Sequence, residues 1–241
     1  MIRYDKGRSL RVITFEGADG CGKTTQMKMT SEYLTACNIP HITAAVPMSG
    51  GTYGAKIREL LLHTNCDGRS NATDVLLFAA ARQCALDAIR ATASNNQCDI
   101  VLIDRWDHSN VAYQCRGSVT DMSEILGLSA VLNHSTVPDF EFYFFAPLDV
   151  VSKRLDVRKK DYFESMGADV LQQRAKDYDT LYSMSQRDHI KVETVDSVEK
   201  SFEIVRQKVN SLVRLWFGWD AEKANKFYAN QFRAVTGPYV A

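Results

Sequence analysis

The chain has 241 residues, of which 45% are hydrophobic and 24% charged, a composition typical of a globular protein with a packed core. Its 29 basic and 29 acidic side chains cancel, so it lacks the excess positive charge expected of a protein that binds nucleic acid or an anionic membrane.

The first ten residues lack the apolar run of a signal peptide, and no stretch approaches the roughly 18 apolar residues of a membrane span. The six cysteines are scattered without a C-x-x-C pair, which argues against a zinc site and favours reduced thiols. We therefore expect a cytoplasmic protein without nucleic-acid or membrane partners.

Short β-branched runs alternate with longer helical patterns along the first half of the chain. A buried strand is expected over residues 10–16, followed by a glycine-rich loop and a helix over 23–37. A second strand over 41–46 precedes a helix over 53–62. A capping pattern then predicts a long helix over 71–94.

The second half of the chain continues this alternation. Residues 99–104 form an almost wholly apolar strand, as expected in a parallel sheet that is covered on both faces. The remaining expected elements are helices over 121–133, 148–158, 168–185 and 198–216 and strands over 140–145 and 190–195. The predicted fold is therefore a three-layer α/β fold, with a five-stranded parallel sheet, helices on both faces and right-handed crossovers.

The glycine-rich loop over residues 17–24 matches the pattern G-x-x-x-x-G-K-[ST] and lies between a predicted strand and a predicted helix. Its backbone N–H groups can surround phosphate oxygens, and the helix N-terminus adds partial positive charge. Lys23 can reach the β- and γ-phosphates, and the Thr24 hydroxyl can bind Mg²⁺. A turn that only connects strand and helix is the alternative, but Lys and Thr in register favour a nucleoside triphosphate site. The residues expected to bind ATP are Gly17, Ala18, Asp19, Gly20, Cys21, Gly22, Lys23, Thr24 and Thr25.

Two further pairs of residues indicate an acceptor site. Asp104 and Arg105 end the third strand, and ligands of open α/β sheets bind beyond the carboxyl ends of the strands. Asp104 can hold Mg²⁺ through water and Arg105 can grip a phosphate, although a surface ion pair explains the two residues equally well. Phe78 and Arg82 share a helix face and suit a planar heterocycle, although a core Phe and a surface Arg explain that pair better when it is taken alone.

Taken together, these segments resemble the thymidylate kinase family, which are P-loop nucleoside monophosphate kinases that convert dTMP to dTDP. The resemblance covers roughly residues 12–205 and rests on VITFEGADGCGKTTQ, GGTYGAKIRELLL, LLFAAAR, DRWDHSNVAYQ and PDFEFYFFAP, in that order. It implies that ATP and a deoxypyrimidine monophosphate are the substrates, that Mg²⁺ is the cofactor and that the chain forms a homodimer.

The resemblance also implies roles for individual residues. Asp19 would face the sugar 3′-hydroxyl and the metal region, and Arg58 and Arg105 would hold the monophosphate. Phe78 would stack on the pyrimidine, and Arg82 would bond its 4-carbonyl. The residues that would line the base and sugar are Ser109, Asn110, Tyr113 and Gln114, with Tyr113 excluding a ribose 2′-hydroxyl.

Cations for the transferring phosphoryl group are expected from the phosphate loop, the acceptor loop and a lid over about residues 154–166. Some family members carry an Arg in the phosphate loop and others take it from the lid, and Gly20 places this chain with the second group. Lys159 and Lys160 also lie in the lid, but a solvated helix end explains them better. The expected catalytic residues are Lys23, Arg105, Arg154 and Arg158.

Two segments depart from the family pattern. Where the family usually has Arg-Glu-Pro before the glycines, residues 45–49 read Ala-Val-Pro-Met-Ser. If the loop is reshaped, we expect dTMP to be accepted but dUMP or a 5-modified dUMP to be used comparably well or better. If the change is a neutral surface variation, dTMP stays strongly preferred, and both possibilities remain open. A deoxynucleoside kinase and a non-catalytic nucleotide switch are weaker alternatives. We expect residues 1–213 to form the kinase domain and the aromatic-rich residues 214–241 to pack on it or on a partner subunit.

Overall fold

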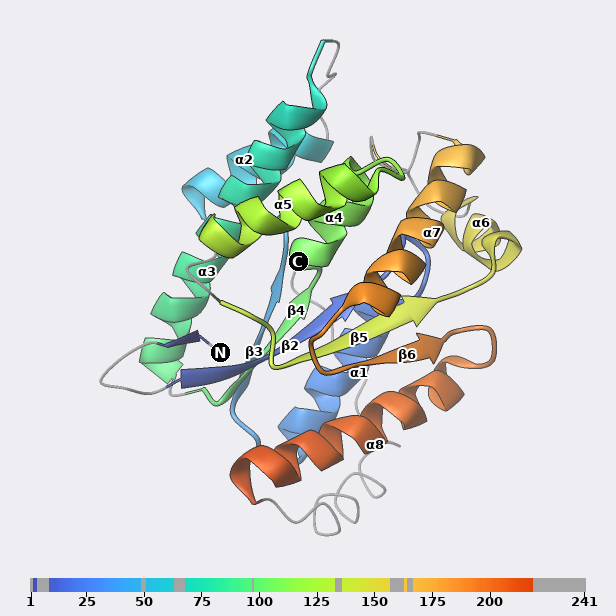
Figure 1. Cartoon of the computed structure of the whole chain (residues 1–241). Coiled ribbons are helices and arrows are strands. Elements are labelled where there is room, and N and C mark those ends of the chain that lie inside the picture. Colours follow the sequence, from blue (N-terminus) through green and yellow to red (C-terminus); the bar gives the residue numbers. More distant parts are fainter. Residues whose placement is uncertain are drawn as a thin grey trace.

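The structure of the protein is a computed structural model, which describes residues 2–3, 9–48, 51–62, 68–96, 98–132, 136–156, 163 and 167–218. Its central feature is a twisted sheet in which five strands run parallel, in the order β3-β4-β2-β5-β6 (Figure 1). The bounds of these strands are Ser9–Glu16 for β2, His41–Ala45 for β3, Ile100–Asp104 for β4, Phe140–Phe145 for β5 and His189–Glu193 for β6. The predicted five-stranded parallel sheet is therefore confirmed.

One short strand was not predicted. β1 (Ile2–Arg3) pairs antiparallel with the beginning of β2, with Ile2 opposite Leu10. Two residues are too few to show a pattern in sequence, and only the neighbouring backbone makes them a strand.

Helices cover both faces of the sheet, as Figure 1 shows. On one face, α1 (Lys23–Ala36) packs with α8 (Val198–Phe217) over Ile13 and Phe15 of β2. On the other face lie α3, α4 and α7, and the apolar residues of α3 pack on Val12 of β2. The bounds of the other helices are Thr52–Leu62 for α2, Asn71–Asn96 for α3, Asp107–Gln114 for α4, Val119–Leu132 for α5, Leu148–Asp156 for α6 and Ala168–Met184 for α7.

The helix α4 was missed by the sequence prediction. All of its residues except Tyr113 are buried, although most of them are polar. A search for apolar residues at helical spacing cannot find such a helix, because its polar face is turned into the protein rather than towards water.

The C-terminal region is described only in part. The helix α8 continues to Phe217, across the expected domain boundary at residue 213, and residues 219–241 lie outside the described part of the chain. Among the described residues, no helix is both long and apolar enough to cross a membrane.

Candidate active site

A cavity of about 590 Å³ opens at the carboxyl ends of β2, β3 and β4. Ligands of open α/β sheets bind at this edge. Lys23 and Thr24 of the phosphate loop line one part of the cavity, and Phe78 and Arg82 of α3 line another. Arg105, from the loop that follows β4, also lines it. Both halves of the predicted site therefore share one cavity.

The phosphate loop has the backbone geometry that an anion cradle requires. Gly17 has a φ of 138°, and a Cβ there would collide with the carbonyl oxygen of Phe144. Gly20 and Gly22 are also left-handed, with φ of 77° and 85°. The loop can therefore follow this path only with glycine at position 17, and the left-handed positions 20 and 22 also favour glycine.

Lys23 lies inside this loop and is 5% exposed. Its Nζ donates to the carbonyl oxygen of Ala18 at 2.8 Å. Burial and the nearby Arg105 lower the pKa of Lys23. The ammonium group is thus held at the cradle by the protein itself, where a phosphate would strengthen its charged form.

Thr24 and Asp104 form a pair that can hold a divalent cation. The Thr24 hydroxyl donates to Oδ2 of Asp104 at 2.5 Å. The other oxygen, Oδ1 of Asp104, is buried and has no hydrogen-bond partner among the described residues. A hydroxyl and a carboxylate beside a phosphate cradle are oxygen donors of the kind that Mg²⁺ takes, directly or through water.

Arg105 connects the phosphate loop with the acceptor side. It has a φ of 71° and pairs with Asp19, and its Nη1 donates to the carbonyl oxygen of Gly17 at 3.1 Å. The same nitrogen donates to the hydroxyl oxygens of Ser109 at 3.3 Å and Tyr178 at 3.1 Å. These contacts tie Arg105 to buried partners, so the alternative explanation, a surface ion pair, does not account for its position.

Asp19 is a carboxylate of the phosphate loop that lines the cavity. Burial by itself would raise its pKa, but Arg105 and Lys23 outweigh burial and lower the pKa to about 2. The hydroxyl of Tyr113 also donates to Asp19. Asp19 is therefore ionised at neutral pH and holds both Arg105 and Tyr113 in place.

Glu16 is a buried carboxylate that sequence analysis gave no role. It is fully buried and accepts hydrogen bonds from the backbone N–H of Trp106, at 2.9 Å, and from the Ser109 hydroxyl. Burial is the main reason that its pKa rises to about 7. Glu16 thus positions the first turn of α4 from the end of β2.

The part of the cavity beside α3 is lined by aromatic rings and by the buried guanidinium of Arg82. Arg82 is 1% exposed, donates to the Ser129 hydroxyl at 3.0 Å and lies 5.8 Å from the ring centroid of Trp106. Phe78 contacts the ring of Phe163, with 5.6 Å between the centroids. Arg82 is therefore not the surface residue of the simpler alternative.

The remaining residues predicted for the acceptor site and the lid lie in different places. Asn110 lines the cavity, and both polar atoms of its amide are buried without a hydrogen-bond partner in the described structure. Arg58 and Arg154 also line it, and they donate to the carbonyl oxygens of Pro47 at 2.5 Å and Gly20 at 3.0 Å. Gln114 is buried but does not line the cavity, whereas Arg158 lies outside the described residues.

Two residues of α7 were also missed. Arg174 and Tyr178 are four residues apart, so they lie on one face of the helix, and both are buried next to the site. Tyr178 contacts Arg105 and Ser109, and Arg174 lies over the ring of Tyr113. Only their spacing could have drawn attention to them, and that spacing is common in helices.

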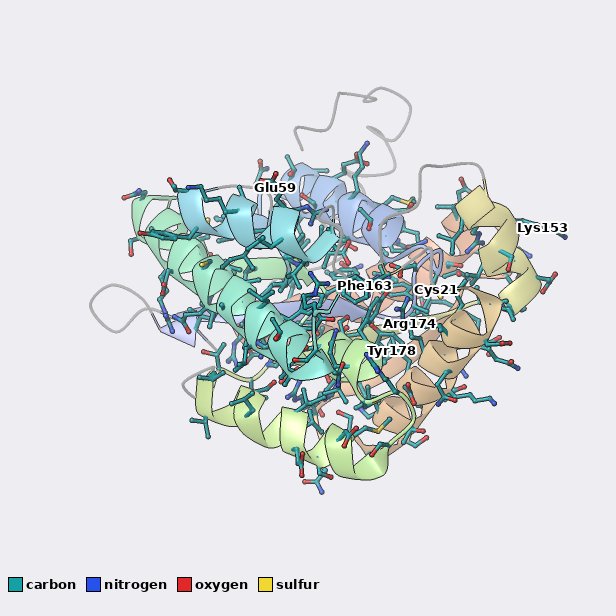
Figure 2. The ribbon with its side chains drawn as sticks, turned by 90° about the horizontal axis from the view of Figure 1, so that it is seen from above. Cys21, Glu59, Lys153, Phe163, Arg174 and Tyr178 are labelled. Atoms are coloured by element: carbon teal, nitrogen blue, oxygen red, sulfur yellow. The ribbon has the colours of Figure 1, made fainter. Side chains whose placement is uncertain are left out.

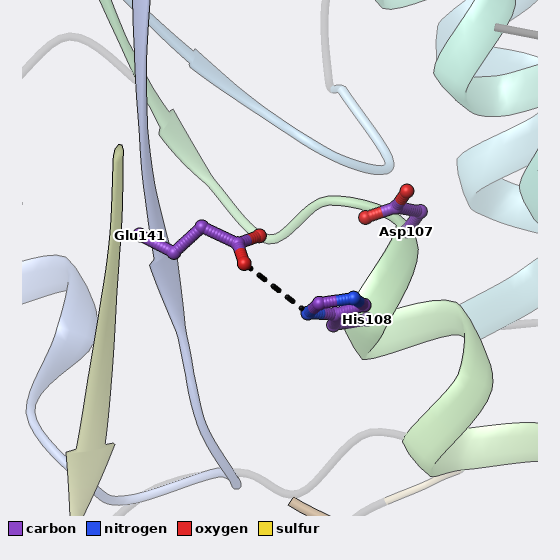
Figure 3. Close-up of side chains that lie close together, drawn as sticks. All are labelled: Asp107, His108 and Glu141. Atoms are coloured by element: carbon purple, nitrogen blue, oxygen red, sulfur yellow. Dashed lines mark ion pairs between the residues drawn. The ribbon is translucent and has the colours of Figure 1, made fainter. Parts of the chain in front are cut away.

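A second polar cluster lies beside the site, between α4 and β5 (Figure 3). Asp107, His108 and Glu141 are buried and close enough together to hold a metal ion, with His108 Nδ1 at 3.4 Å from Glu141. However, Arg187 already donates to Asp107 at 2.6 and 2.8 Å and to Glu141 at 2.9 Å. Burial is the main reason that the pKa of His108 falls. The guanidinium supplies the positive charge, so the cluster is a structural ion-pair network.

Replacing Arg187 with methionine is expected to lower the free energy of unfolding by about 3–5 kcal/mol, because Asp107 and Glu141 would be left buried without a cation. Denaturant unfolding measures this change. As a control, Lys200→Met removes an exposed pair with Asp196 and is expected to cost less than about 1 kcal/mol. Equal losses in the two variants would contradict the structural role of Arg187.

A phosphate cradle and a basic, aromatic-walled acceptor pocket on one edge of a parallel sheet define a P-loop phosphotransferase. The family model described as Thymidylate kinase matches residues 15–209. Similar curated proteins include the thymidylate kinase of Fervidobacterium nodosum, 38% identical over 64% of this chain and 76% of the relative. The thymidylate kinase of Synechococcus sp. is 32% identical over 85% of this chain and 99% of the relative, and that of Prochlorococcus marinus (strain NATL1A) is 33% identical over 85% and 98%.

The chain therefore belongs to the thymidylate kinase family, as its motifs predicted. It is an ATP-dependent kinase, and its α/β fold is the P-loop kinase fold that was expected.

Proposed function

We propose that this protein transfers the γ-phosphoryl group of ATP to dTMP, giving dTDP and ADP. The observation that carries the proposal is the position of Arg105, which binds Asp19 and Gly17 of the phosphate loop and also reaches Ser109 beside the acceptor pocket. A phosphate on Arg105 lies next to the cradle, and the cavity then extends to Phe78 and Arg82, where a pyrimidine fits.

The reaction needs alignment and charge neutralisation rather than a strong base. An oxygen of the acceptor phosphate is already anionic, so it can form the new bond to the γ-phosphorus as the bond to the bridging oxygen breaks and ADP leaves. Lys23 and Arg105 are the described cations at this point, and Arg154 is close by on α6. We infer that Arg58 also holds the acceptor phosphate and that Arg158 joins from the lid.

Thr24 and Asp104 would hold Mg²⁺, the latter through water. When bound, Mg²⁺ neutralises charge on the phosphates and orients them. The buried unpartnered oxygen of Asp104 supports this assignment.

The base and sugar would be recognised by the walls of the cavity. Phe78 would stack on the pyrimidine, Arg82 would bond its 4-carbonyl and Asn110 offers an unpartnered amide. Tyr113 lies within cation–π distance of Arg105 and contacts Phe163, which in turn contacts Phe78, so it stands between the phosphate side and the base side. The sugar would therefore lie against Tyr113.

The comparisons favour dTMP over dUMP or a 5-modified dUMP as acceptor. The structure removes part of the reason for the other hypothesis. Met48 does not line the cavity, because its side chain packs on Gly54 of α2 so closely that a Cβ at Gly54 would lie 2.8 Å from it. Among the residues of the altered loop that the structure describes, Ala45, Val46 and Pro47 line the cavity.

Two other functions have less support. A deoxynucleoside kinase needs a free carboxylate base near the sugar 5′-hydroxyl, but Glu16 is occupied by Trp106 and Ser109. A non-catalytic nucleotide switch would not require Lys23, Arg105 and a complete acceptor pocket in one cavity.

Steady-state kinetics with dTMP, dUMP and 5-hydroxymethyl-dUMP test the proposed substrate. We expect kcat/KM to be at least about tenfold higher for dTMP, because one methyl group in an apolar pocket gives about 10- to 200-fold discrimination. If dUMP or the 5-hydroxymethyl analogue is used equally well or better, the proposal that dTMP is the acceptor is contradicted. If ADP is released with none of the three substrates, the proposal that the protein is a pyrimidine monophosphate kinase is contradicted.

We further propose that the protein is a cytoplasmic homodimer that takes nucleotides as substrates and binds neither nucleic acid nor a membrane, with residues 214–241 packed on the kinase domain or on the partner subunit. The family resemblance supports the homodimer, and light scattering of the full chain at micromolar concentration tests it.

A further inference from the structure

Arg174 is a buried cation beside the acceptor site that the proposed reaction does not use. It is 3% exposed and lies on the side of α7 that faces the middle of the molecule, as does Tyr178, with Phe163 beside it (Figure 2). Its Nη1 donates to the carbonyl oxygen of Phe163 at 2.7 Å. Its guanidinium carbon lies 4.2 Å from the ring centroid of Tyr113.

Two guanidinium groups, those of Arg174 and Arg105, therefore contact the ring of Tyr113. Arg105 lies 5.0 Å from the same ring, and the Tyr113 hydroxyl donates to Asp19. The ring also forms a T-shaped pair with that of Phe163, with 5.8 Å between the two centroids. The Tyr113 side chain is thus held at its ring and at its hydroxyl, by residues from the phosphate loop, the acceptor loop and α7.

Arg174 itself does not line the cavity, whereas Tyr113 does. Arg174 reaches the wall of the cavity through its contacts with Tyr113 and Phe163, and its charge also helps to lower the pKa of Asp19. Because Tyr113 stands between the phosphate-binding Arg105 and the base-side Phe78, the part of a nucleotide that it meets is the sugar.

We propose that Arg174 is a positioning residue that fixes the ring of Tyr113 and thereby sets the discrimination between a 2′-deoxyribose and a ribose monophosphate. This inference rests on the proposed function. Tyr113 can exclude a ribose 2′-hydroxyl only if its ring keeps its orientation, because a ring that could rotate away would leave room for the extra oxygen. A guanidinium over an aromatic ring is attracted to it more strongly when both groups are desolvated, and this contact holds the ring in one orientation.

The test measures kcat/KM for dTMP and for its ribose counterpart, 5-methyluridine 5′-monophosphate, in wild type and in Arg174→Met. We expect the ratio of the two values to fall about tenfold or more in Arg174→Met, mainly because the ribonucleotide is used better. Arg174→Lys keeps a cation over the ring and is expected to restore most of the ratio. Lys176→Met, an exposed change on the same helix, is the control and should leave the ratio unchanged.

A second arm shows whether Arg174 acts through Tyr113. In a Tyr113→Leu background, Arg174→Met should no longer change the ratio, because the ring that it positions is gone. If Arg174→Met does not fold, Arg174→Gln takes its place with the same expected loss. Thermal unfolding and dTMP binding by calorimetry show that each variant is folded and competent.

The possible outcomes separate the inference from the proposed function. An equal loss for both substrates in Arg174→Met, with the ratio unchanged, would mean that Arg174 only stabilises α7 and would overturn the inference. A ratio that still falls in the Tyr113→Leu background would overturn it as well. Failure of the wild-type protein to phosphorylate dTMP would instead overturn the proposed function, and with it the sugar role on which the inference rests.

Discussion

Replacing Lys23 with alanine is expected to lower kcat by about 10²–10³-fold while the protein remains folded, because removing one preorganised contact to a developing charge typically costs this much. Lys23 is held at the cradle by the carbonyl oxygen of Ala18 and contributes little apolar surface to the core. Coupled ADP release measures the rate, and circular dichroism measures the fold.

The control for this variant is Lys28→Ala, which changes a half-exposed lysine on the same helix, α1. We expect Lys28→Ala to have wild-type kcat. Near-wild-type turnover in Lys23→Ala, with an unchanged spectrum, would contradict the assignment of this loop as the catalytic cradle.

Arg105→Ala and Arg82→Ala are expected to fail in different ways. In the proposed function Arg105 holds the acceptor phosphate, so its loss should lower kcat/KM by about 10²–10³-fold for dTMP, dUMP and dCMP alike. In the same proposal Arg82 bonds the base. Its loss should therefore erode the preference for thymine over cytosine, since a site built to hydrogen-bond a substrate group owes its selectivity to that bond. Kinetics with the three monophosphates distinguish the two patterns.

Arg90→Ala, on the same helix as Arg82 but paired with the exposed Asp87, is the matched control and should change neither quantity. Because Arg82 is buried, thermal unfolding must accompany its kinetics. The same loss across all three monophosphates in both variants would show that the two arginines do not divide phosphate and base between them.

The sequence by itself determined the fold class and the phosphate loop of this protein. Residues 17–24 form a local motif whose geometry depends on glycines within eight consecutive positions, so it can be recognised without tertiary contacts. Strands such as β4 are buried throughout and apolar in nearly every position, and their alternation with helices leaves few topologies open. For these features, neighbouring residues carry the whole signal.

Only the tertiary structure decided which buried polar residues support the site. Glu16 meets Ser109, Arg105 meets Tyr178 and Arg174 meets Tyr113 across separations of about 60 to 90 residues, and no periodicity along the chain records such pairs. The helix α4 was missed for the same reason, because most of its buried residues are polar. Buried polar groups are stable only when distant partners satisfy them, so their roles become visible only once the sheet has brought those partners together.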